Sequence, residues 1–317
     1  MINQKTKIAV SGSLAYDYIM NFPGFFSQHI LPSEIHNLNL SFTLNSLRRS
    51  FGGTAGNIAY NLALLGAKPL IFGVAGFDFA EYNIWLKKHR ITTNFINVVK
   101  GDKTASAYII TDQADNQLAA FYPGPLPKNY VSSKLLKNKI GLAIISPDDK
   151  NRMLAYAALY KKHGIPYIFD PGQALIAYSA AELKRIISSA EVIIGNDYEI
   201  KVLLDKLKLN LSELTKKLKI LIITKGSQGS EIYSNKEKIV IKPAKPKNTS
   251  DPTGAGDAYR AGFIKGLISG LDLKSCGQLG GLVSVYTVEK AGTQTHSFTK
   301  AELLKRYQKN YQEKLYL

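Results

Sequence analysis

The sequence predicts an α/β fold: a three-layer α/β/α arrangement with a mostly parallel central sheet and a small β-sheet lid. Two observations support this prediction. Short apolar runs alternate with helical patterns over most of the 317 residues. Two stretches break this alternation: an irregular segment with alternating apolar positions, and a run of strand patterns that no helix separates. Strand–helix alternation of this kind is typical of a parallel sheet that helices cover on both faces.

The elements of the main body follow from hydrophobic period and stop signals. Apolar runs of strand length occupy residues 7–14, 69–76, 141–147, 165–172, 191–199 and 220–226. Helices are expected at 55–66, from 78 to 86, at 153–160, at 255–270 and at 300–317. The first helix carries Ile58, Leu62 and Leu65 on one face and stops at Gly66, and Asp78 is expected to cap the second helix.

Two segments, roughly 17–46 and 95–122, are expected to form the lid. The second reads as successive strands, FINVVK, ASAYIITD and QLAAFYPG, and residues 104–111 alternate with the period of two that a half-buried strand shows. We expect this lid at the carboxyl end of the main sheet, where open α/β folds bind ligands. The chain has no repeat or linker, so residues 1–317 are expected to form one domain.

Composition restricts the class of protein. The 45% hydrophobic content suffices for a large core, and Cys276 is the only cysteine, which fits a reducing compartment. No signal-peptide pattern or membrane-length apolar run is present, so we expect a cytoplasmic protein without membrane contact. The net charge is +17, but lysines spread along the chain supply most of it, and no nucleic-acid-binding motif accompanies them. We therefore expect no nucleic-acid partner.

A glycine-containing motif, DPTGAGDAYRAGF, occupies residues 251–263 at the start of a predicted helix. Gly254 and Gly256 let the backbone turn, and the free N–H groups of a helix N-terminus bind anions. Asp257 could simply stabilise the first turn, an effect of ~0.3–1 kcal/mol. Alternatively, the amides stabilise a phosphoryl group in transfer while Asp257 accepts the proton of the attacking hydroxyl. The residues alone leave both interpretations open.

A second motif, FGGTAGNIAYNLALLG, occupies residues 51–66. Gly52 and Gly53 precede a helix that begins near Asn57, whose amide offers a donor and an acceptor for a substrate hydroxyl. A glycine turn followed by a helix cap is the plain alternative.

In this order, the two motifs resemble the signatures of the ribokinase-like (PfkB) carbohydrate and nucleoside kinase family. The resemblance covers essentially the whole chain. It implies a ribokinase-like fold and ATP-dependent transfer of the γ-phosphoryl group to a primary hydroxyl of a sugar or nucleoside. By position, Asp257 is then the catalytic base, and the anion hole consists of Gly254, Ala255 and Gly256.

The resemblance extends to the nucleotide and substrate sides. NDYE, at 196–199, is similar to the family's N-x-x-E motif, which implies that Asn196 and Glu199 act on Mg²⁺ and the phosphates, Glu199 through water. A helix cap by Asn196 is the alternative. TKGSQGS resembles the segment that borders the nucleotide, so the ATP-site candidates there are Thr224, Lys225 and Gly226, unless they only form a glycine turn. The substrate-side candidates are Asp17, Gly52, Gly53 and Asn57, although Asp17 could merely end a strand.

The acceptor is expected to be adenosine, because RRSFGGTAGNIAYNL, TDQADNQLAAFYPG, IFDPGQ and GDAYRAG resemble the bacterial adenosine kinase or nucleoside kinase branch. A nucleoside base needs an aromatic ring on which to stack, and Phe121 is the first candidate. Other lid aromatics, each of which could instead be lid core, are Tyr16, Phe42 and Tyr122. A sugar kinase for ribose or fructose is the alternative, and a non-catalytic ligand-binding protein is less favoured.

ATP, Mg²⁺ and a small nucleoside or sugar are therefore the expected ligands. The chain is expected to be a monomer or a homodimer. A monovalent cation beside Asp251 and Thr253, as in some relatives, is left open.

Overall fold

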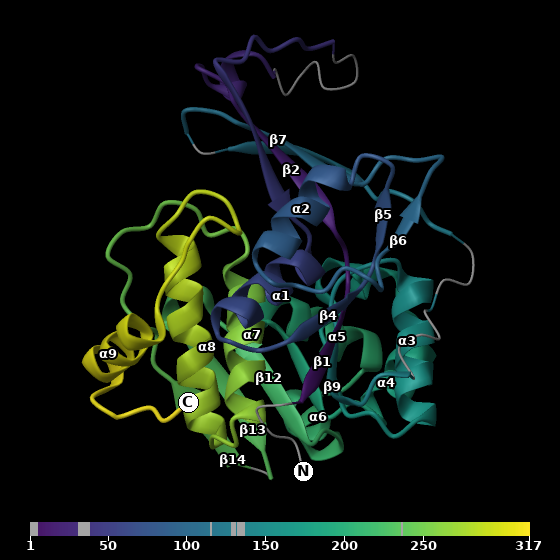
Figure 1. The fold of residues 1–317 in the computed structure, drawn as a ribbon, viewed down its shortest axis with the longest axis vertical. Coiled ribbons are helices and arrows are strands. Elements are labelled where there is room, and N and C mark those ends of the chain that lie inside the picture. The colour runs from purple at the N-terminus through teal and green to yellow at the C-terminus, as the bar shows by residue number, and fades with distance from the viewer. Residues whose placement is uncertain (1–5, 31–38, 115, 128–130, 132–136, 236) are drawn as a thin grey trace.

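The computed structural model describes residues 6–30, 39–114, 116–127, 131, 137–235 and 237–317. A central sheet with helices on both sides forms the body of the molecule, and a smaller sheet projects over one end of it (Figure 1). Among the described residues, none of the helices combines the length and apolar content that a membrane crossing needs.

The central sheet has the strand order β14-β13-β12-β11-β10-β9-β1-β4. Its strands are β1 Lys7–Ser11, β4 Pro69–Phe72, β9 Ile140–Ile145, β10 Tyr167–Phe169, β11 Val192–Asn196, β12 Ile220–Thr224, β13 Ser230–Ser234 and β14 Glu237–Ile241. The pairings from β4 across to β12 are parallel, whereas β12 pairs with β13, and β13 with β14, in antiparallel orientation. The prediction of a mostly parallel sheet is confirmed.

Alternate residues of most central strands contribute to two separate cores. On β1, Ile8 and Val10 pack in one apolar cluster, whereas Ala9 between them packs in the other. Helices that contribute to the first core are α1 Thr54–Leu64, α2 Ala80–Lys88, α7 Ala255–Ile268 and α8 Leu273–Val288. Those of the second core are α3 Lys150–Lys162, α4 Ala180–Ile187, α5 Asp197–Leu207 and α6 Leu211–Lys217. The three predicted layers follow from this alternation.

The lid is a four-stranded sheet in the order β3-β2-β7-β8. Its strands are β2 Ala15–Asn21, β3 Ser46–Gly52, β7 Ala105–Thr111 and β8 Gln117–Tyr122. The strand expected from FINVVK does not join it: β6 Asn97–Val99 pairs instead with β5 Val74–Gly76. β3 also continues to Gly52, past the expected lid boundary at residue 46, because it pairs along the full length of β2.

Two local expectations need correction. Asp78 does not cap α2; its Oδ1 accepts hydrogen bonds from the Thr104 N–H and hydroxyl, at 2.8 and 2.6 Å, and so ties α2 to the start of β7. The final helix, α9 Lys300–Tyr311, ends before the residue 317 that the pattern suggested. It packs against α8 in a third apolar cluster.

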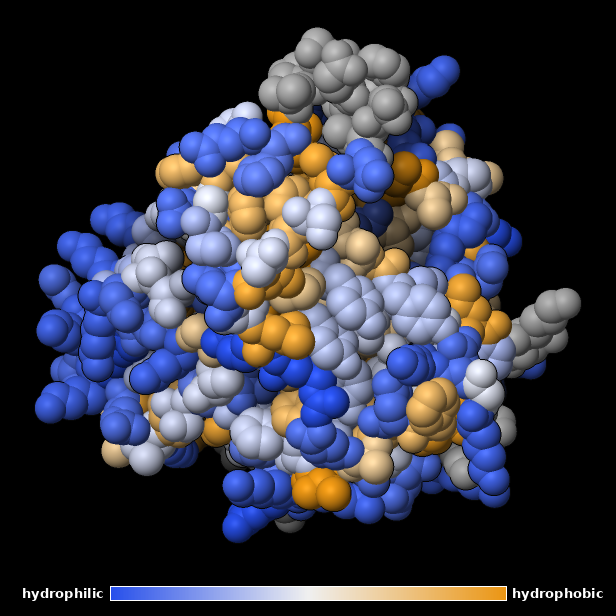
Figure 2. Space-filling model, turned by 90° about the horizontal axis from the view of Figure 1, so that it is seen from above, coloured by the Kyte–Doolittle hydropathy of each residue, from blue (hydrophilic) through white to orange (hydrophobic). Residues whose placement is uncertain are grey.

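The surface seen from above the lid is mostly hydrophilic, and its apolar side chains lie in separate groups (Figure 2). Exposed apolar side chains on the lid strands include Leu47, Tyr108, Leu118 and Phe121. Scattered apolar residues of this kind are normal on a globular surface, so exposure alone assigns them no role.

Candidate active site

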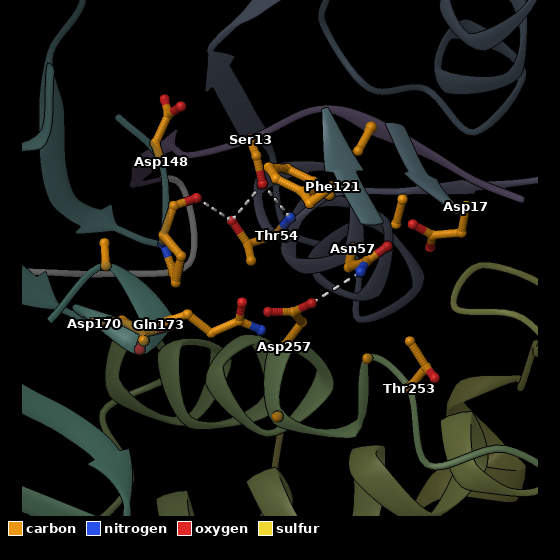
Figure 3. A pocket seen from close by; sticks show the side chains of 18 of the residues that line it. Ser13, Asp17, Thr54, Asn57, Phe121, Asp148, Asp170, Gln173, Thr253 and Asp257 are labelled. Atoms are coloured by element: carbon orange, nitrogen blue, oxygen red, sulfur yellow. Dashed lines mark hydrogen bonds between the residues drawn. The ribbon is translucent and has the colours of Figure 1, made fainter. Parts of the chain in front are cut away.

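A cavity of about 1030 Å³ opens between the lid and the carboxyl ends of the central strands. Most of the predicted site residues line it: Asp17, Gly53, Asn57, Phe121, Asn196, Glu199, Thr224, Gly226, Gly254, Gly256 and Asp257. Gly52, Ala255 and Lys225 are not among its lining residues. Figure 3 shows Asp257 projecting from the start of α7 toward Asn57 on α1, with Asp17 to one side and Gln173 to the other.

The first turn of α7 presents free backbone amides to the cavity. Gly254 is the N-cap, with φ +79°, a left-handed conformation that glycine adopts without strain. The Ala255 N–H donates to the Pro252 carbonyl at 3.1 Å, whereas the N–H groups of Gly254, Gly256 and Asp257 have no acceptor within the described part of the chain. Of the three residues predicted for the anion hole, Gly254 and Gly256 therefore keep free amides beside the cavity.

Asp257 is half-buried and is held by a neighbouring amide. The Asn57 Nδ2 donates to its Oδ2 at 2.8 Å (Figure 3). Burial raises the pKa of Asp257 to about 7, with Arg260 and the Asn57 hydrogen bond opposing the rise and the carboxylates of Asp170 and Asp17 adding to it. A carboxyl group with a pKa near neutrality is suited to act as a general base at physiological pH.

A buried ion pair, which the motifs did not predict, fixes the same turn. Both carboxylate oxygens of Asp170 accept from the Arg260 guanidinium, the Nη2–Oδ1 pair at 2.7 Å. The Arg260 Nη1 also donates to the Gly256 carbonyl at 2.9 Å, which anchors the helix start to the end of β10. An arginine among the small residues of AYRAG was the available sequence signal, because a charge there needs a buried partner.

Asn196 and Glu199 form a reciprocal cap at the start of α5. The Glu199 N–H donates to the Asn196 Oδ1 and the Asn196 N–H donates to the Glu199 Oε2, each at 2.8 Å. The capping alternative is therefore realised, and both residues line the cavity as well. Burial raises the pKa of Glu199, and the nearby Asp170 carboxylate adds to the rise.

These residues fit a magnesium ion held through water. Carboxylate oxygens are ligands that Mg²⁺ prefers, and the crowding of Glu199 by Asp170 is relieved when a cation enters. The described residues contain no group of three or more acidic, histidine or cysteine side chains arranged to hold a metal directly. Mg²⁺ in phosphate sites usually keeps several waters and binds one or two carboxylates, so a water-mediated role for Glu199 agrees with this geometry.

On the lid side, the two glycines of the second motif make room for other groups. A Cβ at Gly52 would lie 2.2 Å from the Asp17 Oδ2, so only glycine lets this carboxylate sit there. Gly53, with φ +82°, is the N-cap of α1 and lies close to the backbone of Ala15 and Ser13. Burial raises the pKa of Asp17 to about 6, and the Asp251 carboxylate contributes.

Asp17 and Phe121 lie in one row across the lid. Ser50 pairs with Asp17, Asp17 pairs with Ala107, and Ala107 pairs with Phe121. Directly paired residues share a face of a sheet. Asp17 and Phe121 are thus two strands apart, about 10 Å, with only the small Ala107 side chain between them.

Phe121 is the aromatic residue that faces the cavity, at 61% exposure. The other candidate aromatics are engaged elsewhere. Tyr16 is buried and donates to the Asp78 carbonyl, Phe42 packs against Phe22 and Phe26, and the Tyr122 hydroxyl donates to Asp102.

Among the predicted ATP-site residues, Thr224 and Gly226 reach the cavity but Lys225 turns aside. The Lys225 Nζ lies 2.6 Å from Glu231 Oε1 in an ion pair on the neighbouring strand β13. The Thr224 hydroxyl donates to the Gly195 carbonyl at 3.4 Å. Gly226, with φ +54°, makes the turn that follows β12.

Residues 5–300 match the model of the pfkB family of carbohydrate kinases. A nucleoside kinase of Methanocaldococcus jannaschii is 32% identical over 307 residues, which are 96% of this chain and 97% of that protein. A second nucleoside kinase, of Methanothermobacter thermautotrophicus, is 31% identical and covers 93% of this chain and 94% of its own length.

Among solved structures, Burkholderia thailandensis nucleoside kinase in complex with ADP-inosine superimposes with a TM-score of 0.86. Its sequence identity is 36%, and the alignment covers 97% of each chain.

Proposed function

We infer that this chain, which belongs to the pfkB carbohydrate kinase family, is an ATP-dependent nucleoside kinase and that its acceptor is the 5′ hydroxyl of adenosine. One observation supports a nucleoside over a free sugar: the lid row places an acidic group and an exposed aromatic ring about 10 Å apart, with small Ala107 between them. Asp17 would hold the ribose hydroxyls while the base lies against Phe121. A free sugar leaves the Phe121 end of the row unused.

In the proposed reaction, the Asp257 carboxylate accepts the proton of the 5′ hydroxyl. The 5′ oxygen forms a bond to the γ-phosphorus of ATP, the bond from that phosphorus to the β–γ bridging oxygen breaks, and ADP leaves. The free amides of Gly254 and Gly256 point at the phosphoryl group and stabilise its negative charge in the transition state. Asn57 and the Arg260–Asp170 pair hold the base and the amides in place.

Magnesium, held through water by Glu199, would neutralise phosphate charge in this site. Asn196 and Thr224 border the nucleotide in the proposal, together with Gly226. A monovalent cation beside Asp251 and Thr253 is proposed as well, although the Asp251 carboxylate already accepts the N–H groups of Thr253 and Gly292, both at 3.0 Å. Rates measured with K⁺, with Na⁺ and with neither ion test that site.

The test of the acceptor is ADP release measured with adenosine, inosine, guanosine, cytidine, ribose and fructose. Adenosine should give the highest kcat/KM, and inosine, named in the complex of the Burkholderia relative, is its first competitor. A preference for ribose or fructose would establish the sugar kinase alternative. Release of ADP with none of the six would contradict the proposal.

The stacking role of Phe121 is tested by Phe121→Ala. Loss of a base–aromatic stack costs about 1–2 kcal/mol, so the KM for adenosine should rise roughly 5- to 30-fold and the KM for ribose much less. Leu118→Ala is the matched control, because it removes an apolar side chain from the same strand on the opposite lid face. Equal rises for adenosine and ribose would argue against stacking.

We also propose a cytoplasmic location, because the single cysteine, Cys276, is buried and cannot form an intrachain disulfide, which fits a reducing compartment. A monomer or homodimer is proposed because the lid ends in two exposed strand edges, β3 and β8, that can pair with another chain. Light scattering on the purified protein separates these two states.

A further inference from the structure

A buried chain of polar side chains leads from α2 to the proposed base. The Trp85 Nε1–H donates to the Gln294 Oε1 at 3.0 Å. The Gln294 Nε2 donates to the Asn57 Oδ1 at 3.0 Å and to the Tyr82 hydroxyl oxygen at 2.6 Å. Asn57 in turn donates to Asp257. Gln294 is 2% exposed and lies in the loop between α8 and α9, outside every motif considered above.

The Trp85 indole sets which group donates and which accepts along this series of hydrogen bonds. An indole N–H can only donate, so it must meet the carbonyl oxygen of the Gln294 amide rather than its nitrogen. The hydrogen of the Tyr82 hydroxyl is used on the Gly52 carbonyl at 2.8 Å, so the Tyr82 oxygen is left to accept. The Gln294 Nε2 therefore has two acceptors for its two hydrogens, and no other arrangement satisfies all four groups.

The orientation of the Asn57 amide follows from the same donor and acceptor requirements. Its Oδ1 must face Gln294, so its Nδ2 must face Asp257. The third glycine of the motif fits this arrangement, because a Cβ at Gly56 would lie 1.9 Å from the Tyr82 hydroxyl. Gly56 thus makes room for the polar chain rather than for a phosphate.

We propose that Gln294 is a positioning residue that, held by Trp85, fixes the Asn57 amide with its donor toward Asp257. A fixed donor favours the ionised carboxylate, which is the stronger acceptor, over the protonated carboxyl group. If the amide could turn, its oxygen would accept a hydrogen bond from the protonated carboxyl group instead, and the proton-accepting form of the base would lose its advantage. The other charged groups that face Asp257 are Arg260, Asp170 and Asp17. This inference rests on the proposed function, in which Asp257 is the base.

The test is Gln294→Met, which keeps the volume and removes both ends of the amide. We expect the acid limb of the kcat–pH profile to move up by about one pH unit, since a hydrogen bond to a charged group is worth about one to two units. At pH 7 kcat should fall roughly 5- to 10-fold, while at pH 9 it should approach the native value. A purely structural loss would lower kcat equally at every pH.

Gln278→Met is the matched control. Gln278 is 5% exposed, accepts from the Tyr307 hydroxyl and is not among the residues that line the cavity. It should leave the pH profile in place. Trp85→Phe is the second variant, because it removes the N–H that orients Gln294 together with part of the indole ring, and the acid limb of its kcat–pH profile should move in the same direction. If Gln294→Met does not fold, Trp85→Phe tests the proposal instead.

A measurement without turnover separates this inference from the proposed function. In protein labelled with ¹³C at the aspartate carboxyls, the signal absent from Asp257→Asn reports the Asp257 titration, and its midpoint should rise in Gln294→Met. If the native enzyme is active but neither Gln294→Met nor Trp85→Phe moves the Asp257 titration midpoint or the acid limb of the kcat–pH profile, the positioning role alone is overturned. A native protein that phosphorylates none of the acceptors, yet shows the moved midpoint, overturns the proposed function and supports the positioning role.

Discussion

Asp257→Asn should abolish turnover and, above neutral pH, stabilise the protein. Asparagine keeps the shape of the side chain and can still accept the hydrogen bond from Asn57, so nucleoside and ATP affinities should change little. It cannot take a proton from the acceptor hydroxyl. General bases contribute about 10²- to 10⁴-fold, so kcat should fall by at least that range.

The stability change follows from the raised pKa. The pKa of Asp257 rises from 3.8 to about 7 because the carboxylate is buried. A rise of about three units corresponds to about 4 kcal/mol. The folded state holds this proton more tightly than the unfolded state, so the stability that the protonated group contributes is complete below pH 4 and is lost as pH rises through 7.

Asparagine carries no charge and escapes this loss. It also forgoes the attraction to Arg260, so we expect a net gain of roughly 2–3 kcal/mol at pH 8 and little change at pH 4. That gain corresponds to a rise of several degrees in Tm.

Coupled ADP-release assays give kcat, calorimetric titration gives the two affinities, and thermal unfolding at pH 4, 6 and 8 gives the stability difference. A variant that keeps a tenth or more of native turnover would refute the assignment of the base. A Tm difference that does not grow between pH 4 and pH 8 would refute the burial argument even if turnover is lost.

Three further outcomes are expected. Native kcat should increase about tenfold per pH unit below pH 7 and level off above it, because the pKa of Asp257 is about 7; a limb near pH 4 would contradict this. Gly52→Ala should raise the nucleoside KM by tenfold or more with ATP binding intact, because its Cβ would displace the Asp17 carboxylate 2.2 Å away; an unchanged KM would show that Asp17 does not bind substrate. Lys225→Ala should change the ATP KM less than about threefold, because Glu231 holds the ammonium group and such pairs contribute little; a large rise would place Lys225 at the nucleotide.

The sequence located Asp257, Asn57 and the glycine turns because each motif is local. A helix N-terminus and its glycine lie within a few consecutive residues, so their geometry is nearly independent of the remaining fold. The strand pattern of residues 104–111 was visible for the same reason, since period-two alternation is also a local feature.

The partners of these residues were not visible. Gln294 bonds to Asn57 across 237 residues of sequence, and Arg260 bonds to Asp170 across 90. Asp78 looked like a helix cap, but Thr104 competes for its carboxylate from the start of β7. Pairings of this kind depend on how the sheets and helices stack, which residue patterns do not encode locally.

The charge of the cavity is opposite in sign to that of the chain. The chain carries +17, yet six carboxylates line the cavity and Arg260 is the only basic residue among its described lining residues. Surface lysines act on ligands within a Debye length, about 8 Å at physiological ionic strength, so they can attract ATP to the surface but not neutralise it inside. Arg260 is itself paired with Asp170. Most of the positive charge that a triphosphate needs beside Asp257 would then arrive with it, and the Mg²⁺ proposed above, bound to ATP, would supply that charge.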